Sequence, residues 1–195
     1  MTIDPPLNPE RTAVLSMDMH TGIVALYVSD REAFTSRAAS LLGFCRGRGM
    51  MIIHVQVGFR PGFPEISPRN LLFNAIRESP ERQKLFQGKT GKIHASVAPV
   101  GDDVVITKHR ISAFTGTDLD MILRARGVDT VVLFGIATSG VVLSTLLDAV
   151  DADYRAIVVE DCCADRDAEL HAALMERLFP LRGAVATAAE VLASL

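Results

Sequence analysis

The sequence has no excess of positive charge and few cysteines. Its 20 lysines and arginines are outnumbered by 23 aspartates and glutamates, which gives a formal net charge of −3. A nucleic-acid partner is not expected, because phosphate binding needs a basic face. The three cysteines, Cys45, Cys162 and Cys163, form no CxxC motif and no Cys/His ligand spacing. We therefore expect reduced thiols in a cytoplasmic protein, without a disulfide framework or a structural zinc site.

Signals for export and for membrane insertion are also lacking. The start, MTIDPPLNPE, is acidic and proline-rich, without the basic segment that begins a signal peptide. Residues 130–147 carry no charge, and a run of this length approaches a short transmembrane helix. However, the centre of the run contains glycine, threonine and serine, and its first part is β-branched. We interpret it as a buried strand followed by a helix and expect no membrane partner.

Short apolar runs alternate with amphipathic segments along most of the chain. Strands are predicted at Ala13–Met17, Met50–Val57, Asp103–Thr107, Thr130–Phe134, Arg155–Val159 and Ala184–Ala186. Because these runs are apolar without alternation, they indicate strands buried on both faces, as in a parallel sheet covered by helices on each side. No linker or internal repeat interrupts the pattern. Residues 1–195 are therefore expected to form a single α/β domain.

Helix signals agree with this arrangement. Apolar spacing predicts a helix over Arg31–Arg48, and Ser79-Pro80-Glu81 places an N-cap before a proline and an acidic residue. Thr117–Asp120 resembles a capping box with aspartate in place of glutamate, and Thr187–Glu190 matches the box fully. The segment Gly58–Asn70 contains three prolines and two glycines. It is too long for a plain connector, so we expect it to cover or line a site.

Polar residues follow several of the predicted strands. Asp18 follows the first, Lys108 follows the third, and the turn GIATSG (135–140) follows the fourth. Ligands of open parallel sheets bind outside the carboxyl ends of the strands, so these residues should share one rim. Since neighbouring strands lie about 4.8 Å apart, Lys108 could reach Asp18 and orient it for proton transfer. The alternatives are an Asp18 that caps the following turn and a solvated Lys108.

The turn itself offers no side chain with obvious chemistry. Gly135–Gly140 matches half of the phosphate-binding GxxxxGK[ST] motif, but Val141 and Val142 occupy the lysine and hydroxyl positions. No GxGxxG is present either, so a nucleotide or dinucleotide cofactor is not expected. Ser139 has a hydroxyl that can act as a nucleophile, but the sequence pattern places no histidine near it to act as the base. A hydrogen bond within the turn is the alternative for its hydroxyl.

Four segments, taken in order, resemble the isochorismatase-like superfamily, also called the cysteine hydrolases. They are VLSMDMH around Asp18, VVITKHRISAFTGTDL around Lys108, VVLFGIATSGVVLSTLLDA around the turn, and YRAIVVEDCCAD after it. The resemblance covers nearly the whole chain. It implies a three-layer α/β/α sandwich with a six-stranded parallel sheet. It also implies a catalytic set of aspartate, lysine and cysteine, of which the first two correspond to Asp18 and Lys108.

The cysteine of this set has no counterpart in the chain. Val141 stands at its position, near the start of the helix after the turn, and a valine cannot form a thioester. The isochorismatases of this superfamily also lack the cysteine and cleave a vinyl ether, with the aspartate as the acid. The turn would then supply backbone donors through Ala137, Thr138, Ser139 and Gly140. The resemblance further implies a non-proline cis peptide bond at Ala137–Thr138.

Other candidates are assigned to the same rim. Two aromatic residues and two arginines are predicted as walls of a substrate pocket, the arginines being suited to a carboxylate: Phe59, Phe114, Arg60 and Arg110. His20 is expected either to touch substrate or to lie at a loop surface. Cys162 and Cys163 could approach the site, although small buried hydrophobic residues are the more frequent role of such cysteines. The aspartate and histidine metal ligands of nicotinamidase relatives are absent from GFRPGFP, so no metal is expected.

Together these observations predict an isochorismatase-like hydrolase that acts on a small molecule. The molecule would be anionic if the predicted arginines line the pocket. Asp18 and Lys108 would perform the chemistry without a cysteine nucleophile, a metal or another cofactor. The alternative is a catalytically silent relative that keeps the fold and binds a small molecule. The resemblance also implies a homodimer or a larger homo-oligomer.

Overall fold

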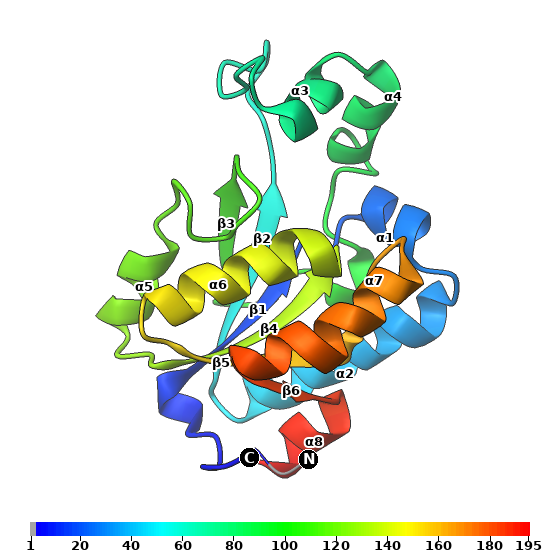
Figure 1. Cartoon of the computed structure of the whole chain (residues 1–195). Coiled ribbons are helices and arrows are strands. Elements are labelled where there is room, and N and C mark those ends of the chain that lie inside the picture. Colours follow the sequence, from blue (N-terminus) through cyan, green and yellow to red (C-terminus); the bar gives the residue numbers. More distant parts are fainter. Residues whose placement is uncertain (1–2) are drawn as a thin grey trace.

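A computed structural model describes residues 3–195, in which a six-stranded sheet lies between two layers of helices (Figure 1). The strands are β1 (Thr12–Met17), β2 (Met51–Val57), β3 (Val104–Lys108), β4 (Thr130–Ile136), β5 (Arg155–Ala164) and β6 (Ala184–Ala186). All neighbours pair in parallel, in the order β3-β2-β1-β4-β5-β6. The fold class predicted from the sequence is confirmed.

The largest difference in strand bounds concerns β5, which continues to Ala164 instead of ending at Val159. Its pairing with β4 moves from Leu133 opposite Val158 to Gly135 opposite Cys163. Between these pairs one residue on β4 therefore lies opposite four on β5, and β5 bulges at this point. The polar residues in the bulge look like the end of a strand in the sequence, which is why the extension was missed.

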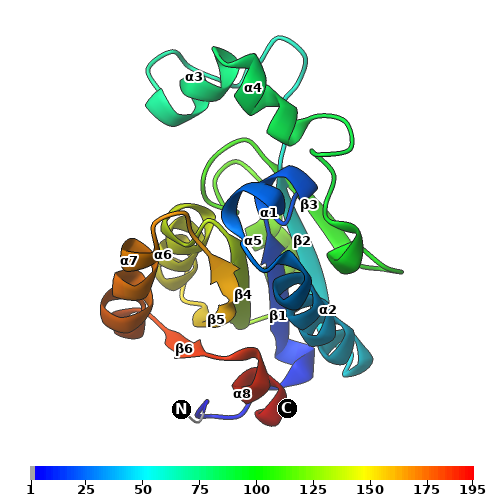
Figure 2. The same cartoon turned by 90° about the vertical axis from the view of Figure 1, so that its right-hand side faces the viewer.

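Helices cover both faces of the sheet (Figures 1 and 2). One face carries α5 (Leu119–Ala125), α6 (Leu143–Asp151) and α7 (Ala168–Ala173). The other carries α1 (Thr21–Tyr27), α2 (Arg31–Gly47) and α8 (Ala188–Ala193). Shorter 3-10 or π turns lie at Pro9–Arg11, Lys84–Phe86, Ala95–Val97, Thr138–Val142, Leu174–Leu178 and Phe179–Leu181.

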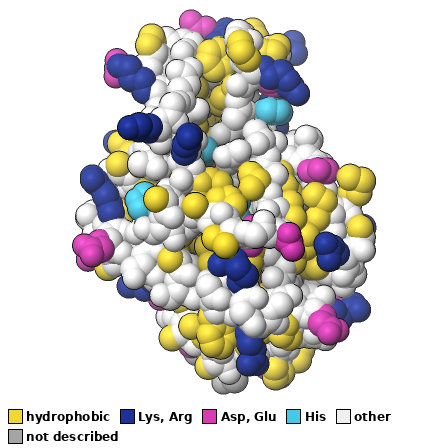
Figure 3. Space-filling model, turned by 180° about the vertical axis from the view of Figure 1, so that it is seen from behind, with side chains coloured by type: hydrophobic (Ala, Val, Ile, Leu, Met, Phe, Trp, Pro, Cys, Tyr) yellow, Lys and Arg dark blue, Asp and Glu magenta, His cyan; other side chains and the backbone are white. Residues whose placement is uncertain are grey.

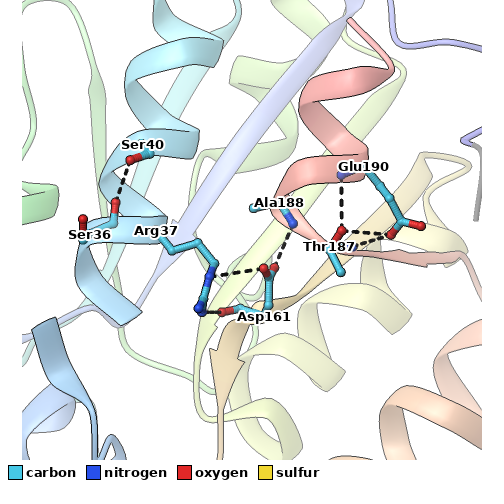
Figure 4. Close-up of polar contacts among 7 residues, drawn as sticks. All are labelled: Ser36, Arg37, Ser40, Asp161, Thr187, Ala188 and Glu190. Carbon is cyan, nitrogen blue, oxygen red and sulfur yellow. Dashed lines mark hydrogen bonds and ion pairs between the residues drawn. The ribbon is translucent and has the colours of Figure 1, made fainter. Parts of the chain in front are cut away.

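Asp161, in the bulge of β5, joins three elements (Figure 4). Its Oδ2 lies 3.3 Å from Nε of Arg37 on α2, and its backbone oxygen accepts a 2.7 Å hydrogen bond from the same guanidinium. Its Oδ1 accepts the backbone N–H of Ala188 at 2.8 Å, at the start of α8. The predicted capping box of Thr187 and Glu190 opens α8. The bulge thus fixes both helices on this face of the sheet.

Of the other two predicted helix caps, one is found and one is not. Ser79 accepts the backbone N–H of Arg82 and caps α4 (Pro80–Gln83), as predicted. The capping box at Thr117 is wrong, because α5 begins after Asp118 and has no side-chain cap. The Thr117 hydroxyl donates to the backbone oxygen of Ala113 at 2.6 Å instead. The same oxygen accepts the backbone N–H of Leu119 at 3.3 Å, so a local turn uses the group that the sequence pattern assigns to the capping box.

Between β2 and β3 the chain leaves the sheet and protrudes at the top of Figure 1. We call residues 58–90 the cap; it contains α3 (Leu71–Arg77) and α4. Ile66, Phe73 and Ile76 of the cap form a small apolar cluster with Val57 at the end of β2, separate from the main core. The cap therefore stands over the carboxyl ends of β2 and β3.

Within residues 3–195 the structure contains no helix that is long and apolar enough to cross a membrane. The uncharged run 130–147 is made of β4, the turn after it and the first part of α6, as interpreted from the sequence.

Candidate active site

Asp18 and Lys108 form a buried ion pair above the carboxyl edge of the sheet. Lys108 ends β3, Asp18 follows β1, and the end of β2 lies between them. The Lys108 Nζ lies 2.8 Å from Oδ2 of Asp18 and donates a second hydrogen bond, of 3.1 Å, to the backbone oxygen of Arg110. Only 3% of the lysine side chain and 12% of the aspartate side chain are exposed. The lysine thus holds one carboxylate oxygen in a largely dry place.

The other carboxylate oxygen of Asp18 is free to accept a hydrogen bond. Within the described chain, Oδ1 is buried and has no hydrogen-bond partner. The backbone N–H of Asp18 still continues the sheet by donating to Val55 at 2.8 Å. The residue itself adopts a left-handed conformation with φ 53°, which aspartate tolerates better than most side chains. The strand therefore ends abruptly at the residue that carries the unpartnered oxygen.

Gly135 allows the turn after β4 to approach this point closely. Its φ is 144°, and a Cβ at this position would collide with the backbone oxygen of Met17. Only glycine fits so near the residue that precedes Asp18. The cis peptide follows, at Ile136–Ala137, one bond earlier than the predicted Ala137–Thr138. The resemblance located the turn correctly but placed this bond one residue too late.

A cavity of about 140 Å³ opens beside the ion pair. Asp18 and Lys108 are the only charged residues in its lining, all of which lies within the described chain. The rest comes from α1, the end of β2, the cap, the loop after β3, and the end of β4 with the turn that follows it: Ile23, Tyr27, Val57, Leu72, Phe73, Ile76, Phe86, Ile111, Ile136, Ala137, Gly140 and Val141. A carboxylate and an ammonium group thus face a small space with predominantly apolar walls. Such a cavity can hold the reacting part of a small molecule and exclude bulk water.

The other two predicted turn residues point away from this cavity and anchor the turn. The Thr138 hydroxyl lies 2.8 Å from Nδ1 of His171 on α7. Ser139 donates to Oδ2 of Asp165 through its backbone N–H and through its hydroxyl, both at 2.7 Å. The hydroxyl of Ser139 is therefore engaged in a hydrogen bond, but its partner lies after β5 and not within the turn as the sequence suggested.

Sequence reasoning missed both anchors. Asp165 closes the segment YRAIVVEDCCAD, and a carboxylate directly after a strand of this sheet was a usable signal. His171 comes from the middle of a helix, where nothing in the local sequence marks it as a partner of the turn.

Comparisons with known proteins show the family of this chain. The isochorismatase domain family matches residues 12–190. This chain belongs to the isochorismatase family. A maleamate amidohydrolase from Pseudomonas putida is 32% identical over 168 residues, which are 84% of this chain and 76% of that protein. Members of the family are hydrolases, and the chain shares their α/β fold.

Two solved structures are similar over almost the full length. An isochorismatase family protein from Burkholderia thailandensis has a TM-score of 0.82 and 32% identity, with 98% of each chain covered. A cysteine hydrolase from Pseudomonas syringae pv. phaseolicola has a TM-score of 0.87 and 27% identity, covering 100% of this chain and 96% of that one.

The four residues predicted as pocket walls lie outside the lining of the 140 Å³ cavity. Phe59 packs behind the lining, with its ring centroid 5.7 Å from that of Phe73. The guanidinium of Arg60 is largely exposed and lies 2.6 Å from Glu65. The loop Gly58–Asn70 thus forms the outer part of the cap, and α3 supplies the wall that this loop was expected to supply.

The remaining two wall candidates belong to other contacts. Arg110 reaches the ion pair only through its backbone oxygen, while its guanidinium donates to the backbone oxygen of His109 at 2.6 Å. The ring of Phe114 packs against that of Tyr154, with centroids 5.9 Å apart. The sequence placed both residues close to Lys108 along the chain, but the direction of their side chains depends on tertiary packing.

His20 supports the base of the cap and does not reach the cavity. It is buried, its Nδ1 lies 2.7 Å from the backbone oxygen of Gly91, and its Nε2 accepts the backbone N–H of Val57 at 3.2 Å. The second bond places the ring proton on Nδ1. Neither expectation for His20, substrate contact or loop surface, is met. A histidine that joins β2 to the end of the cap is a structural residue.

The three cysteines, all in the described chain, lie outside the cavity lining. Burial raises the pKa of Cys45 to about 11 and that of Cys163 to about 12. Burial likewise raises the pKa of Cys162. Because the thiolate is the nucleophilic form, these buried thiols are inert at neutral pH.

A larger cavity, of about 540 Å³, lies at the amino ends of the strands. Arg46 lines it, but its guanidinium is already paired with Asp103 at 2.7 Å. Neither Asp18 nor Lys108 reaches this cavity. Within residues 3–195 no group of three or more histidine, cysteine, aspartate or glutamate side chains could hold a metal ion. The smaller cavity is therefore the candidate active site.

Proposed function

We propose that this isochorismatase-family protein hydrolyses a small molecule with Asp18 as the proton-transfer group and Lys108 as its fixed cation. The observation that carries the proposal is the buried, unpartnered Oδ1 of Asp18 beside the cavity. Val141, which the resemblance assigns to the position of the family cysteine, lines the same cavity. The reaction therefore proceeds without a covalent thioester.

The two carboxylate oxygens of Asp18 have different roles in the proposed reaction. Lys108 holds Oδ2, which fixes the orientation of the carboxylate, and Oδ1 of this cavity-lining residue has no partner in the described chain. Oδ1 takes a proton from a water molecule as the water oxygen bonds to the substrate carbon. The leaving group departs with the electron pair of the broken bond and takes the proton back from Asp18. One water is consumed, and the enzyme returns to its starting state.

Two kinds of bond suit this chemistry. The Pseudomonas putida relative is a maleamate amidohydrolase, which supports an amide or a related acyl bond. The vinyl ether of an isochorismatase-type substrate is the second. There the order is reversed, because Asp18 starts protonated, gives its proton to the vinyl carbon, and takes a proton back from the water whose oxygen bonds to the resulting oxocarbenium carbon before the C–O bond breaks. Both need a positioned carboxyl group and neither needs a thiol in this cavity.

A second candidate function is that of a silent relative that binds a small molecule without turnover. The observation in its favour is Val141, since the lining of the cavity, all of it described, contains no cysteine, serine or threonine. On this account the Asp18–Lys108 pair serves only to bind a ligand.

The deciding experiment is a screen of small amides, esters and vinyl ethers with the wild type, D18N and D102N. The amide of D18N is nearly isosteric with the carboxylate but cannot transfer the proton, so hydrolysis should stop. Asp102 is exposed and lies at the opposite edge of the sheet, so D102N should retain full activity. An active D18N with an unchanged fold would refute the mechanism. Ligand binding without turnover of any compound would favour the silent relative.

A further inference from the structure

A second cavity, of about 320 Å³, adjoins the candidate active site. The two cavities share five lining residues: Ile23, Tyr27, Leu72, Ile76 and Phe86. They are therefore separated by no more than these side chains, and the partition between them is almost entirely apolar. On the face opposite to that of Figure 1, hydrophobic side chains gather where the cap meets the body of the molecule (Figure 3). A ligand that extends from the first cavity into the second passes over an apolar surface.

The second cavity adds two arginines that the first one lacks. Arg82 comes from α4 in the cap, and Arg166 follows β5, so segments far apart in the sequence meet here. In Figures 1 and 2 α4 lies above α1, whose residues Ile23, Leu26 and Tyr27 line the space between. Both arginines are exposed residues, so an anion from solution can reach their side chains.

Neither guanidinium is neutralised by the described part of the chain. Arg82 and Arg166 take part in hydrogen bonds through backbone atoms, and among the described residues neither guanidinium donates a hydrogen bond or forms an ion pair. The two carboxylates next to Arg166 in sequence are engaged by other groups. Asp165 accepts from Ser139 and from the backbone N–H groups of Arg166 and Asp167, and Asp167 accepts the backbone N–H of Leu170. Arg60, also in the cap, is by contrast paired with Glu65.

We propose that the second cavity binds a carboxylate of the substrate between Arg82 and Arg166, while the bond to be cleaved lies beside Asp18. Guanidinium groups bind carboxylates through paired, charge-assisted hydrogen bonds. Lys108 cannot take this role, because Asp18 already neutralises it. The substrate is thus a small monocarboxylate with a short apolar part and a hydrolysable group at the far end. The position of the hydrolysable group rests on the proposed function; the carboxylate site does not.

This proposal reassigns the carboxylate contact predicted from the sequence. Arg60 and Arg110 were suited to the task by type, but their guanidinium groups are engaged elsewhere. The arginines that line the extended cavity are Arg82 and Arg166 instead.

Calorimetric titration with 4-phenylbutyrate and its neutral amide, 4-phenylbutyramide, tests the site without requiring turnover. The wild type should bind the carboxylate at least about ten-fold more tightly than the amide, because the pair differs only in the charged group. R82A and R166A should each weaken binding of the carboxylate about ten-fold and leave binding of the amide unchanged. R126A is the matched control, because Arg126 is an exposed arginine at the opposite end of the sheet. It should change neither affinity.

The same titration with D18N separates this proposal from the proposed function. D18N should keep the preference for the carboxylate even though hydrolysis is lost. If D18N still hydrolyses substrate while R82A and R166A lose the carboxylate preference, only the mechanism fails. Equal affinities for the carboxylate and the amide, including no measurable binding of either, would overturn the carboxylate site. Unchanged binding in both R82A and R166A would do the same.

Discussion

At the scale of single residues, the site depends on one carboxylate whose two oxygens have different surroundings. The Oδ2 of Asp18 is held by Lys108 at 2.8 Å, and its Oδ1 has no partner among the described residues. Burying this charge is tolerable only because the lysine accompanies it. The pair is therefore a structural element as well as a proposed catalytic one.

Replacing Lys108 alone should destabilise the fold. K108M removes the cation and leaves the Asp18 carboxylate buried without a counter-charge, which costs about 3 kcal/mol of unfolding free energy. The double variant D18N/K108M should recover a large part of that loss, because it removes both charges. Urea denaturation of the two variants measures the difference. A K108M protein as stable as the wild type would show that water, and not Lys108, offsets the cost of burying the negative charge of Asp18.

Gly135 and Gly140 provide a matched pair for the close approach of the turn. G135A should cost at least about 2 kcal/mol, because its Cβ would meet the backbone of Met17 and its φ is 144°. G140A should be close to neutral, since its Cβ would meet only Ala137, at 3.8 Å. Thermal unfolding of both variants tests this. Equal stabilities of G135A and G140A would contradict the tight packing described for Gly135.

At the scale of elements, the turn between β4 and α6 is held from outside by β5 and α7. Asp165 accepts both the N–H and the hydroxyl of Ser139, and His171 engages Thr138. These contacts fix the turn while Ala137, Gly140 and Val141 line the cavity. The anchors act on the shape of the cavity without entering it.

Removal of the Asp165 carboxylate should loosen this turn. In D165A the amide of Ser139 loses its acceptor, so its hydrogen exchange should accelerate at least about ten-fold, as expected for a lost bond worth about 1.5 kcal/mol. D167A is the control, because Asp167 caps α7 through Leu170 and does not touch the turn. Exchange at Ser139 that is equally slow in D165A and in the wild type would mean that the turn is rigid without this anchor.

The elements also show which parts of the structure could be predicted from the sequence. All six strands and the capping box of Thr187 follow from local patterns, and the structure contains them. Asp18 and Lys108 could be named because strand ends of a parallel sheet share one edge. The walls of the cavity could not, because Leu72, Phe73 and Phe86 reach it from a cap whose placement depends on contacts distant in sequence. The side-chain directions of Arg60 and Arg110 were missed for the same reason.

At the scale of the whole molecule, the two ends of the sheet have different roles. The carboxyl end carries the candidate active site, and the amino end carries a buried polar network of His54, Asp103 and Arg46. His54 is fully buried, with its Nε2 3.2 Å from Oδ2 of Asp103. The network joins α2 to β2 and to the start of β3. It contributes to stability rather than to chemistry.

The buried histidine should make the stability of the protein depend on pH. Burial lowers the pKa of His54 below its ordinary value of 6.5 and outweighs the opposing effect of Asp103. The unfolded chain therefore binds a proton at His54 before the folded chain does, so stability falls as the pH decreases below about 6.5. Above that pH the histidine is neutral in both states, and its contribution does not vary.

Chemical denaturation between pH 7.5 and 5 tests this dependence. The wild type should lose unfolding free energy toward pH 5, and H54Q should show a smaller slope over the same range. H94Q, which changes a histidine outside the network, should keep the slope of the wild type. A slope in H54Q equal to that of the wild type would assign the effect to another group.

The central claim, hydrolysis at Asp18 without a cysteine nucleophile, concerns the molecule as a whole because the three thiols are distributed through its core. Intact-protein mass spectrometry during turnover of a substrate found in the screen tests it most directly. We predict that the only species is the unmodified chain of 21.1 kDa, from the first turnover to the steady state. An adduct of the mass of the acyl group on Cys45, Cys162 or Cys163 would contradict the account and make a buried thiol the nucleophile.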